Sequence, residues 1–194
     1  MKSLNKHVKI INAATKVFAK KGFFNARISD IAKEAKVADG TIYLYFNNKF
    51  DILISVFDEE ISNMISQVNI LLEKEDDPEK MLATFIKKHL SMMKKNRNLA
   101  EVIQIELRQS SKIIKKYRNN KFNDYLDIIA SIIQKGQEQG VYRTDIEPDI
   151  IKMVIFGALD EAARIWSPPS SSKLSADEMA EQLITIFLSG LLLA

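Results

Sequence analysis

Residues 40–49, GTIYLYFNNK, combine hydroxyl groups and amides with apolar side chains. On a helical wheel of about 100° per residue, Ile42 and Phe46 fall on one face. The opposite face and its flanks hold a different set: Gly40, Thr41, Tyr43 and Leu44. Hydroxyl groups bond phosphates, a leucine can contact a thymine methyl group, and a glycine lets the backbone approach a groove floor. This pattern indicates a helix that contacts DNA.

The residues beside this helix carry groups that suit a phosphate backbone. Lys49 begins the next predicted helix, where its ammonium group and the free N–H groups of the helix terminus are expected to hold a phosphate. We predict nine DNA contacts: Arg27, Ser29, Asp39, Gly40, Thr41, Tyr43, Leu44, Tyr45 and Lys49. The alternative is a packed helix pair with exposed tyrosines, in which Tyr45 belongs partly to the core.

The charge of the chain is unevenly distributed. Residues 1–50 hold 10 Lys or Arg and three acidic residues, a net charge of +7, whereas the remaining residues carry −4. A basic excess at one end is typical of a nucleic-acid-binding module, and a solvated basic surface is the alternative. A helical scaffold for a protein partner is a further alternative, which salt-sensitive binding to DNA would exclude.

The composition favours an all-α protein. Hydrophobic residues make up 46% of the 194 residues and charged residues 27%, and only 6 Gly and 4 Pro interrupt the helix-forming stretches. The chain begins without the apolar core of a signal peptide, and no apolar run approaches the roughly 18 residues of a membrane span. Because the chain also has no Cys, we expect a cytoplasmic protein that does not bind a membrane.

Catalytic and metal chemistry finds little support in the sequence. His7 and His89 are the only histidines, and no nucleophile triad, phosphate loop or metal-ligand spacing occurs. Asp160 and Glu161 are adjacent acids, but neighbouring helical positions diverge by about 100° and do not easily share a site. We therefore expect no enzyme activity, no catalytic residue, no metal site and no cofactor.

Apolar residues recur at helical spacing along nearly the whole chain. They predict about nine helices: 5–21, from Ser29 to a break near residue 37, 39–46, 49–73, 78–95, 99–109, 113–139, 149–166 and 175–193. Ser29 is the expected N-cap of the second helix, and Gly22 and Gly140 are expected terminators. Residues 1–50 are expected to form a helix-turn-helix DNA-binding domain, which extends to about residue 65 with the start of the fourth helix. Residues 51–194 are expected to form a helical effector-binding and dimerisation domain.

The N-terminal 50–60 residues resemble the DNA-binding domain of the TetR family of bacterial transcriptional repressors. The family's first helix has the pattern Ile-x-x-Ala-x-x-x-Phe with a closing Gly, which is matched by Ile11, Ala14, Phe18 and Gly22. Its next pattern, Ile-Ala-x-x-Ala-x-Val, is matched by Ile31, Ala32, Ala35 and Val37. The third, Gly-Thr-hydrophobic-Tyr-x-Tyr/His-Phe with an Asn/Lys step, is matched by Gly40 to Phe46, Asn47, Asn48 and Lys49. The resemblance implies a homodimer that represses transcription from a near-palindromic double-stranded operator until a small hydrophobic effector binds the C-terminal domain. Ala38 departs from the family, which often has Ser there, so Asp39 is expected to cap the reading helix.

Within this family, the chain is similar to the fatty-acid-degradation regulators of bacilli. The similarity is carried by ADGTIYLYF, by DILIS at residues 51–55, by Gln-x-Glu-Leu-Arg-Gln-Ser at 104–110 and by Ile-Phe-Gly-x-x-Asp-Glu at 155–161. It implies a repressor of fatty acid degradation genes that long-chain acyl-CoA releases from DNA. The alternative is a repressor of an efflux or other metabolic gene that senses a different hydrophobic molecule.

Polar residues among apolar ones between residues 99 and 166 indicate a ligand pocket. In such a pocket Arg108 could bind a phosphate or carboxylate through two hydrogen bonds, and apolar side chains could enclose an acyl chain. We predict seven ligand contacts: Gln104, Leu107, Arg108, Ile129, Phe156, Asp160 and Trp166. The alternative is that the apolar residues are ordinary core and that Asp160 forms a surface pair with Arg164.

Small residues on the predicted helix at 149–166 would let another helix approach closely: Gly157, Ala158, Ala162 and Ala163. Together with the final helix they predict a two-fold, four-helix dimer interface. Such a dimer would hold its two reading helices about 34–36 Å apart, one turn of DNA, or at a related spacing.

Overall fold

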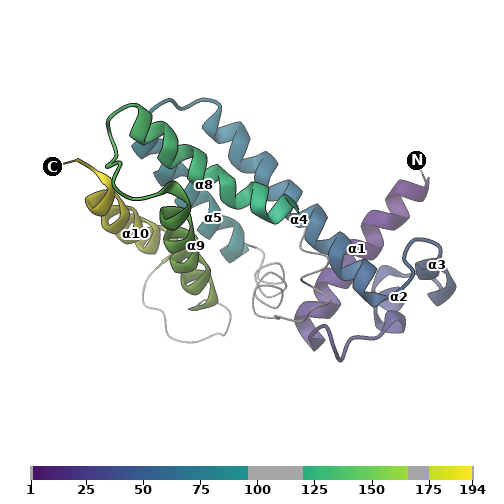
Figure 1. The fold of residues 1–194 in the computed structure, drawn as a ribbon. Coiled ribbons are helices and arrows are strands. Elements are labelled where there is room, and N and C mark those ends of the chain that lie inside the picture. The colour runs from purple at the N-terminus through teal and green to yellow at the C-terminus, as the bar shows by residue number, and fades with distance from the viewer. Residues whose placement is uncertain (1, 96–119, 166–174, 194) are drawn as a thin grey trace. The chain divides into compact units, whose positions relative to one another are not determined.

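The structure, a computed structural model, describes residues 2–95, 120–165 and 175–193. These residues form eight helices (Figure 1): α1 (Lys2–Lys21), α2 (Ile28–Ala35), α3 (Asp39–Tyr43), α4 (Lys49–Leu72), α5 (Pro78–Lys95), α8 (Asn120–Glu138), α9 (Pro148–Ile165) and α10 (Ala176–Leu191). The only β pairing within these ranges is an isolated antiparallel bridge between Tyr142 and Leu192. The all-α prediction is confirmed. The expected helix at 99–109 and the start of the one at 113–139 lie outside the described residues.

The described chain divides into two compact units, and the boundary falls inside α4, between Glu60 and Ile61. The first unit contains α1, α2, α3 and the start of α4, and the second contains the rest of the described helices. None of the described helices combines the length and apolar content that a membrane span requires.

The core of the first unit is built from one apolar face of each of its four helices. The largest contributors are fully or almost fully buried: Ile10, Ile11, Phe18, Phe23, Ile31, Ile42, Phe46, Ile52 and Val56. Gly22 ends α1 as predicted, with a φ of 73° that glycine adopts without steric cost. Its N–H donates to the Phe18 carbonyl at 2.8 Å, so the chain leaves α1 with that carbonyl satisfied.

The start of α2 differs from the prediction. Arg27 occupies the N-cap position and Ile28 is the first helical residue, so Ser29 lies in the first turn and is not the cap. The carboxylate of Asp30 supports the helix start instead, because it accepts hydrogen bonds from the Arg27 backbone N–H at 3.0 Å and from the Lys21 ammonium group at 2.6 Å. The bond from Lys21 is the main cause that lowers the pKa of Asp30.

Two further helix boundaries in this unit differ from the prediction. Helix α1 begins at Lys2, three residues earlier than expected. Helix α3 ends at Tyr43, although the Phe46 N–H still donates to the Ile42 carbonyl at 3.0 Å. The chain therefore keeps a helix-like turn after α3, and the spacing that places Ile42 and Phe46 on one face is preserved.

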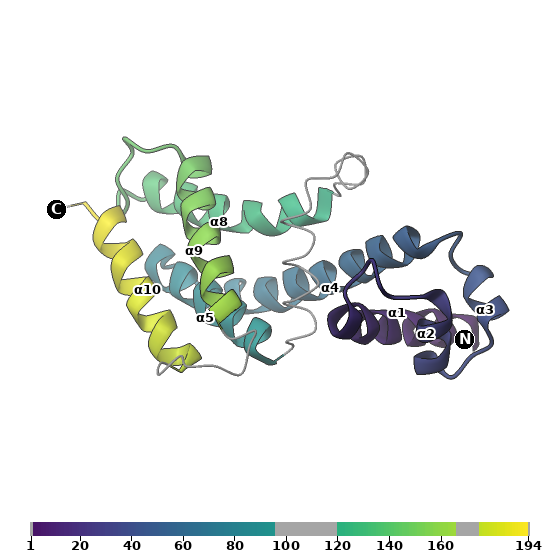
Figure 2. The same ribbon diagram turned by 90° about the horizontal axis from the view of Figure 1, so that it is seen from below.

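Helix α5 is the common neighbour of α8, α9 and α10 in the second unit (Figure 2). Its buried face carries Leu82, Phe85, Ile86, His89, Leu90 and Met93. Pro78 opens α5 and Lys95 ends it, as predicted. The Asp77 carboxylate accepts a hydrogen bond from the Glu79 N–H at 2.9 Å, so one free donor of the helix start is satisfied.

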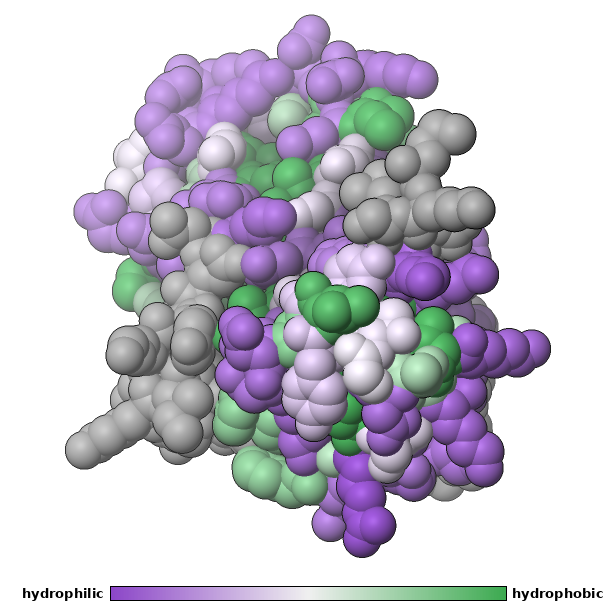
Figure 3. All heavy atoms as spheres, turned by 90° about the vertical axis from the view of Figure 1, so that its right-hand side faces the viewer, coloured by the Kyte–Doolittle hydropathy of each residue, from purple (hydrophilic) through white to green (hydrophobic). Residues whose placement is uncertain are grey.

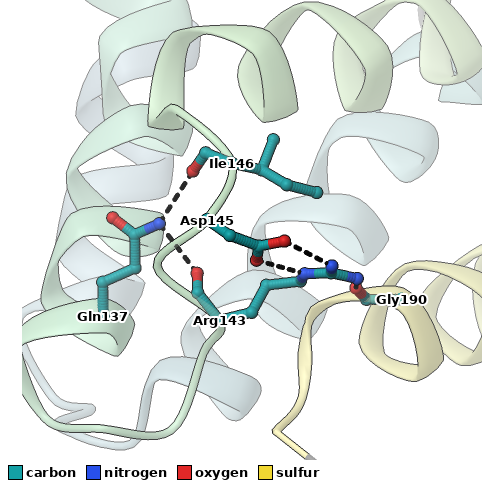
Figure 4. A network of polar contacts seen from close by, with 5 residues as sticks. All are labelled: Gln137, Arg143, Asp145, Ile146 and Gly190. Carbon is teal, nitrogen blue, oxygen red and sulfur yellow. Dashed lines mark hydrogen bonds and ion pairs between the residues drawn. The ribbon is translucent and has the colours of Figure 1, made fainter.

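The loop between α8 and α9 is tied to the end of α10 (Figure 4). Arg143 forms two hydrogen bonds with Asp145, each 2.6 Å long, and donates a longer one to the Gly190 carbonyl at 3.5 Å. The Gln137 amide donates to the Arg143 carbonyl at 2.9 Å and to the Ile146 carbonyl at 3.0 Å. Side chains from the end of α8 and from the loop itself therefore fix its path.

Tyr142 is buried at the base of this loop, with its ring against Gly136. A Cβ atom at position 136 would overlap the ring, so glycine is required there for packing. The Tyr142 hydroxyl is buried without a hydrogen-bond partner among the described residues, and burial together with nearby Glu79 and Asp77 raises its pKa. Gly140, with a φ of 69°, terminates the helical segment as predicted.

The turn between α2 and α3 places a lysine in the left-handed region. Lys36 has a φ of 56°, and its N–H and that of Val37 donate to the carbonyls of Lys33 and Ala32 at 3.2 and 3.0 Å. Glycine usually fills this position because a Cβ atom is strained there. The turn between α2 and α3 is therefore held by these bonds despite local strain.

We expect Lys36→Gly to raise the free energy of unfolding by about 0.5–1 kcal/mol, because relief of the Cβ strain exceeds the added entropy of the unfolded chain. Urea unfolding at fixed protein concentration measures the change. Lys36→Ala, which also removes the charge but keeps the strain, is the matched control and should show no gain. Equal stabilities of the two variants would contradict the prediction.

Candidate nucleic-acid interface

Helix α3 presents opposite faces to the core and to solvent. Ile42 is 0% and Phe46 4% exposed, whereas Tyr43 is 58% and Leu44 81% exposed. Gly40 is also exposed, and a Cβ atom there would meet nothing within 4 Å. Figure 3 shows apolar and near-neutral side chains gathered on this side of the molecule among hydrophilic ones. The division of the helix into buried and exposed faces is confirmed, and the DNA contacts themselves stay a prediction.

The start of α3 has no side-chain cap. Ala38 occupies the N-cap position and makes no capping hydrogen bond, and Asp39 is already the first helical residue. The expectation that Asp39 caps the helix is therefore wrong, because a residue with helical backbone geometry lies past the cap position. Only a backbone bond, from the Thr41 N–H to the Ala38 carbonyl at 2.8 Å, closes this turn. The exposed Asp39 lies in the first turn, where free N–H donors and the helix dipole favour an acidic side chain.

Tyr45 lies between core and surface. It is half-buried and packs against the hydrophobic core of the first unit. The ring of His7 lies 6.2 Å from that of Tyr45 and stacks on Phe46 at 5.2 Å, between ring centroids. The interpretation of Tyr45 as partly core is confirmed, and its DNA contact stays a prediction.

The acidic residues of the first unit neutralise little of its basic surface. Glu34 pairs with Lys16 at 3.4 Å, and Asp30 pairs with Lys21 at 2.6 Å. Several exposed bases form no ion pair within the described structure: Lys6, Lys9, Lys20, Arg27, Lys33 and Lys36. Arg27 and Ser29 are both exposed at the start of α2, as a phosphate contact requires.

The Lys49 ammonium group forms contacts within the fold that the sequence did not predict. Its ammonium group donates to the carbonyls of Phe24 at 3.0 Å and Ala26 at 2.8 Å, and it lies 4.6 Å from the centre of the Phe23 ring. Partial burial lowers the pKa of Lys49. Two of its three N–H donors are therefore used to tie the start of α4 to the loop between α1 and α2.

The N-terminus of α4 is capped within the chain. The Asn48 side-chain oxygen accepts hydrogen bonds from the N–H groups of Phe50 at 2.8 Å and Asp51 at 3.0 Å. The Asp51 carboxylate in turn accepts from the Asn47 N–H at 3.1 Å. The expectation that free N–H groups at this terminus hold a phosphate is wrong for these donors, because Asn48 already occupies them.

Four of the seven predicted ligand contacts lie outside the described residues: Gln104, Leu107, Arg108 and Trp166. Of the others, Ile129 is fully buried, and Phe156 and Asp160 are half-buried. Arg164 pairs with Glu161, its neighbour at i−3, through two hydrogen bonds. Ile129 therefore lies in the interior of the second unit and Phe156 only partly so, and their role in ligand binding stays a prediction.

A buried polar pair joins α5 to α8 beside these residues. His89 Nδ1 and the Tyr125 hydroxyl lie 2.8 Å apart, and the two residues are 3% and 0% exposed. The His89 ring lies 6.0 Å from that of Phe156, and Phe85 lies 5.3 Å from Tyr125, between centroids. Burial lowers the pKa of His89 to about 4 and raises that of Tyr125. A lone histidine on an apolar helix face was the only sequence signal, because its partner is 36 residues away.

The small residues of α9 do not share one surface. Ala162 and Ala163 are buried within the chain itself, and Gly157 is exposed. The interpretation of all four as a docking face is therefore wrong for these two alanines, which already pack inside the second unit. Apolar residues are exposed on α9 and α10 instead: Ile150, Met153, Val154 and Ile186.

A basic helical unit with an exposed reading helix, followed by a second helical unit, defines a helix-turn-helix DNA-binding regulator. Residues 10–56 match the family described as bacterial regulatory proteins of the tetR family. Residues 57–190 match the family described as YsiA-like protein, C-terminal region. The chain belongs to the TetR family, as the resemblance implied.

The similarity to individual proteins extends over both units. The chain is 35% identical over 186 residues to the fatty acid metabolism regulator protein of Bacillus subtilis, covering 96% of this chain and 95% of the relative. The crystal structure of FadR from Bacillus subtilis in complex with stearoyl-CoA matches at a TM-score of 0.87 and 35% identity, over 94% of this chain and 98% of that one. The fatty acid degradation regulator FadR from Bacillus halodurans matches at a TM-score of 0.88 and 34% identity, over 95% of each chain.

We expect Lys49→Ala to lower the free energy of unfolding by about 1–3 kcal/mol, because the carbonyls of Phe24 and Ala26 lose their donor. If the third N–H also holds a phosphate, the slope of log affinity for operator DNA against log salt falls by about 1. Lys49→Arg keeps the charge and serves as control. Unchanged stability would contradict the structural role, and an unchanged slope would contradict the phosphate contact.

We expect His89 to make stability depend on pH. Its pKa of about 4 in the folded protein lies below the ordinary value of 6.5, so the unfolded chain binds the proton more strongly. Its contribution is fully present above pH 6.5 and falls by about 2 kcal/mol between pH 7 and pH 5. Urea unfolding at both pH values measures this loss. Between the same two pH values, the free energy of unfolding of the double variant His89→Leu/Tyr125→Phe should fall by about 2 kcal/mol less than that of the wild type. An equal fall in both proteins would contradict the assignment.

Proposed function

We propose that this chain is the subunit of a dimeric cytoplasmic repressor of fatty acid degradation genes, which long-chain acyl-CoA releases from its operator. The observation that carries the DNA-binding part is the exposed face of α3, since a leucine 81% exposed beside a tyrosine 58% exposed is an apolar surface directed outward. The effector is proposed from the stearoyl-CoA complex of the Bacillus subtilis relative.

The proposed DNA interface consists of the exposed residues of α2 and α3 and the start of α4. Tyr43 and Thr41 donate to phosphates, Leu44 contacts a thymine methyl group, and Gly40 lets the backbone approach the groove. The remaining proposed contacts come from the flanks of the reading helix: Arg27, Ser29, Asp39, Tyr45 and Lys49. The Asp39 carboxylate must face N–H donors, because a phosphate would repel it.

The proposed dimer interface uses the outer surfaces of α9 and α10. Ile150, Met153 and Val154 are each about half exposed on α9, and Gly157 continues the same face one turn further. Ile186 supplies an exposed apolar residue on α10. Removing these side chains from water would stabilise a two-fold four-helix contact, and a two-fold dimer matches a near-palindromic operator.

The proposed response to ligand is a shift between two populations of the dimer. Helix α4 is continuous from Lys49, beside the reading helix, to Leu72 in the second unit. A ligand that binds more tightly to the state in which the two reading helices are mis-spaced therefore releases DNA through movement of α4. The proposed ligand contacts are Gln104, Leu107, Arg108, Ile129, Phe156, Asp160 and Trp166.

A gel-shift assay on the promoter beside the chain's own gene tests the proposal. We expect a salt-sensitive complex that acyl-CoA from lauroyl to oleoyl dissociates, while free CoA does not. Leu44→Ala tests the reading helix, because an exposed leucine can be truncated without unfolding the protein, and it should weaken the complex about 10-fold. DNA binding indifferent to every acyl-CoA would overturn the effector and leave the family assignment standing.

A further inference from the structure

Helix α2 carries charges of opposite sign on its two flanks. Asp30 and Glu34 lie four residues apart on one flank, and each pairs with a lysine of α1, at 2.6 and 3.4 Å between nitrogen and oxygen. Ser29 and Lys33 lie four residues apart on the other flank, about 100° further round the helix, and both are exposed. Because the acidic flank faces α1, the flank with Lys33 is turned away from α1 and carries a base and no acid.

A second exposed base, Lys36, follows Lys33 by three residues and occupies a strained backbone position. It is the C-cap of α2, with a φ of 56° and a ψ of 46°, and among the described residues it is the only non-glycine with a positive φ. The bonds that hold this turn come from backbone N–H groups, so they would form equally with glycine and without the crowding of a Cβ atom. The fold therefore accounts for the turn but not for the exposed lysine side chain within it.

The dipole of α2 is the structural alternative for Lys36. A cation suits the C-terminus of a helix, where the last carbonyls carry partial negative charge. Lys33 already supplies a cation in the last turn of α2, and at an exposed site this interaction is weak and screened by salt. Strained residues are concentrated where a surface has a function, so the strain at Lys36 points to a partner outside the fold that attracts a cation.

We infer that Lys36 binds a phosphate of the operator DNA beside the reading helix. In a helix-turn-helix motif the first helix crosses the sugar-phosphate backbone and the second enters the major groove, so the turn between them lies at the edge of the groove. Lys36 precedes Asp39, the first residue of α3, by three residues, and a lysine ammonium group binds phosphate as a point charge. This inference rests on the proposed DNA interface and extends it from α3 to the turn and to the flank of α2 that carries Lys33.

The test measures operator binding against salt concentration, without any acyl-CoA. Lys36→Ala removes the charge and keeps the strain, so it should weaken binding about 10-fold at about 0.1 M salt and lower the slope of log affinity against log salt by about 1 per subunit. Lys36→Arg keeps the charge and should leave the slope unchanged. Lys74→Ala removes the same charge from an exposed position in the second unit, and it is the matched control that should bind as the wild type does.

Lys36→Gly separates DNA binding from folding. It removes the charge and the strain together, so it should raise the midpoint of urea unfolding by about 0.3–0.5 M while weakening operator binding as much as Lys36→Ala does. A protein that is more stable and yet binds DNA more weakly has not lost affinity through unfolding. Operator binding by Lys36→Gly that equals that of the wild type would overturn the inference.

The outcomes also separate this inference from the proposed function. A phosphate contact carries no sequence information, so Lys36→Ala should weaken binding to the operator and to a scrambled duplex by the same factor. A loss confined to the operator would indicate a displaced reading helix and would overturn the inference, as would an unchanged salt slope, while operator binding by the wild type stands. A wild type that does not bind the operator would overturn the proposed DNA interface as well.

A second measurement changes the DNA and locates the contact. Operator duplexes in which one phosphate at a time is replaced by an uncharged methylphosphonate are compared for the wild type and Lys36→Ala. At the phosphate that Lys36 binds, the replacement should weaken wild-type binding about 10-fold and leave Lys36→Ala binding unchanged, because the contact is already absent in the variant. Equal losses in the two proteins at every phosphate would overturn the inference.

Discussion

The burial of Ile42 and Phe46 is the constraint on which the proposed DNA-binding surface depends. Helix α3 has only five residues, and a helix of that length is not stable in isolation. It also lacks a side-chain cap. The two buried side chains therefore fix both its existence and its rotation, and the exposure of Tyr43 and Leu44 follows from helical geometry once the inner face is anchored.

Side-chain hydrogen bonds also fix the segment that follows α3. Asn48 and Asp51 fix the start of α4 through three backbone N–H bonds, and Lys49 ties it to the loop that follows α1. These bonds fix the first turn of α4 to residues 47–48 and to the loop between α1 and α2. Helix α4 itself continues past the unit boundary at Glu60 and ends at Leu72.

Local patterns predicted the helices well, because helical periodicity and glycine terminators are properties of adjacent residues. Pro78 and Lys95 bound α5 as expected, and the two faces of α3 follow from the wheel alone. Contacts between distant residues were not predictable. The carbonyls that bind Lys49 lie 23 and 25 residues away, so its ammonium group looked free for a phosphate.

The same limit applies to the second unit. Ala162 and Ala163 looked like a docking surface because small residues on a helix do not reveal which neighbour they face. The N-cap of α2 failed for a different reason. Serine is a frequent cap, but here the chain path from Gly22 brings Asp30 within reach of the Arg27 N–H and the Lys21 ammonium group. The tertiary position of one carboxylate therefore accompanies an N-cap at Arg27, two residues before the expected Ser29.

The cores of the two units differ in whether their buried polar groups have hydrogen-bond partners. This difference affects how a ligand can act. In the first unit the buried Thr15 hydroxyl donates a hydrogen bond to the Ile11 carbonyl at 3.1 Å, so this donor is satisfied within one helix. In the second unit His89 and Tyr125 bond to each other, whereas the buried Tyr142 hydroxyl has no hydrogen-bond partner among the described residues. A core whose polar groups are all satisfied gains little from an added ligand and stays a rigid scaffold. A core that retains unmet donors can gain free energy from a ligand in the state that exposes them, and only such differential binding shifts a conformational equilibrium.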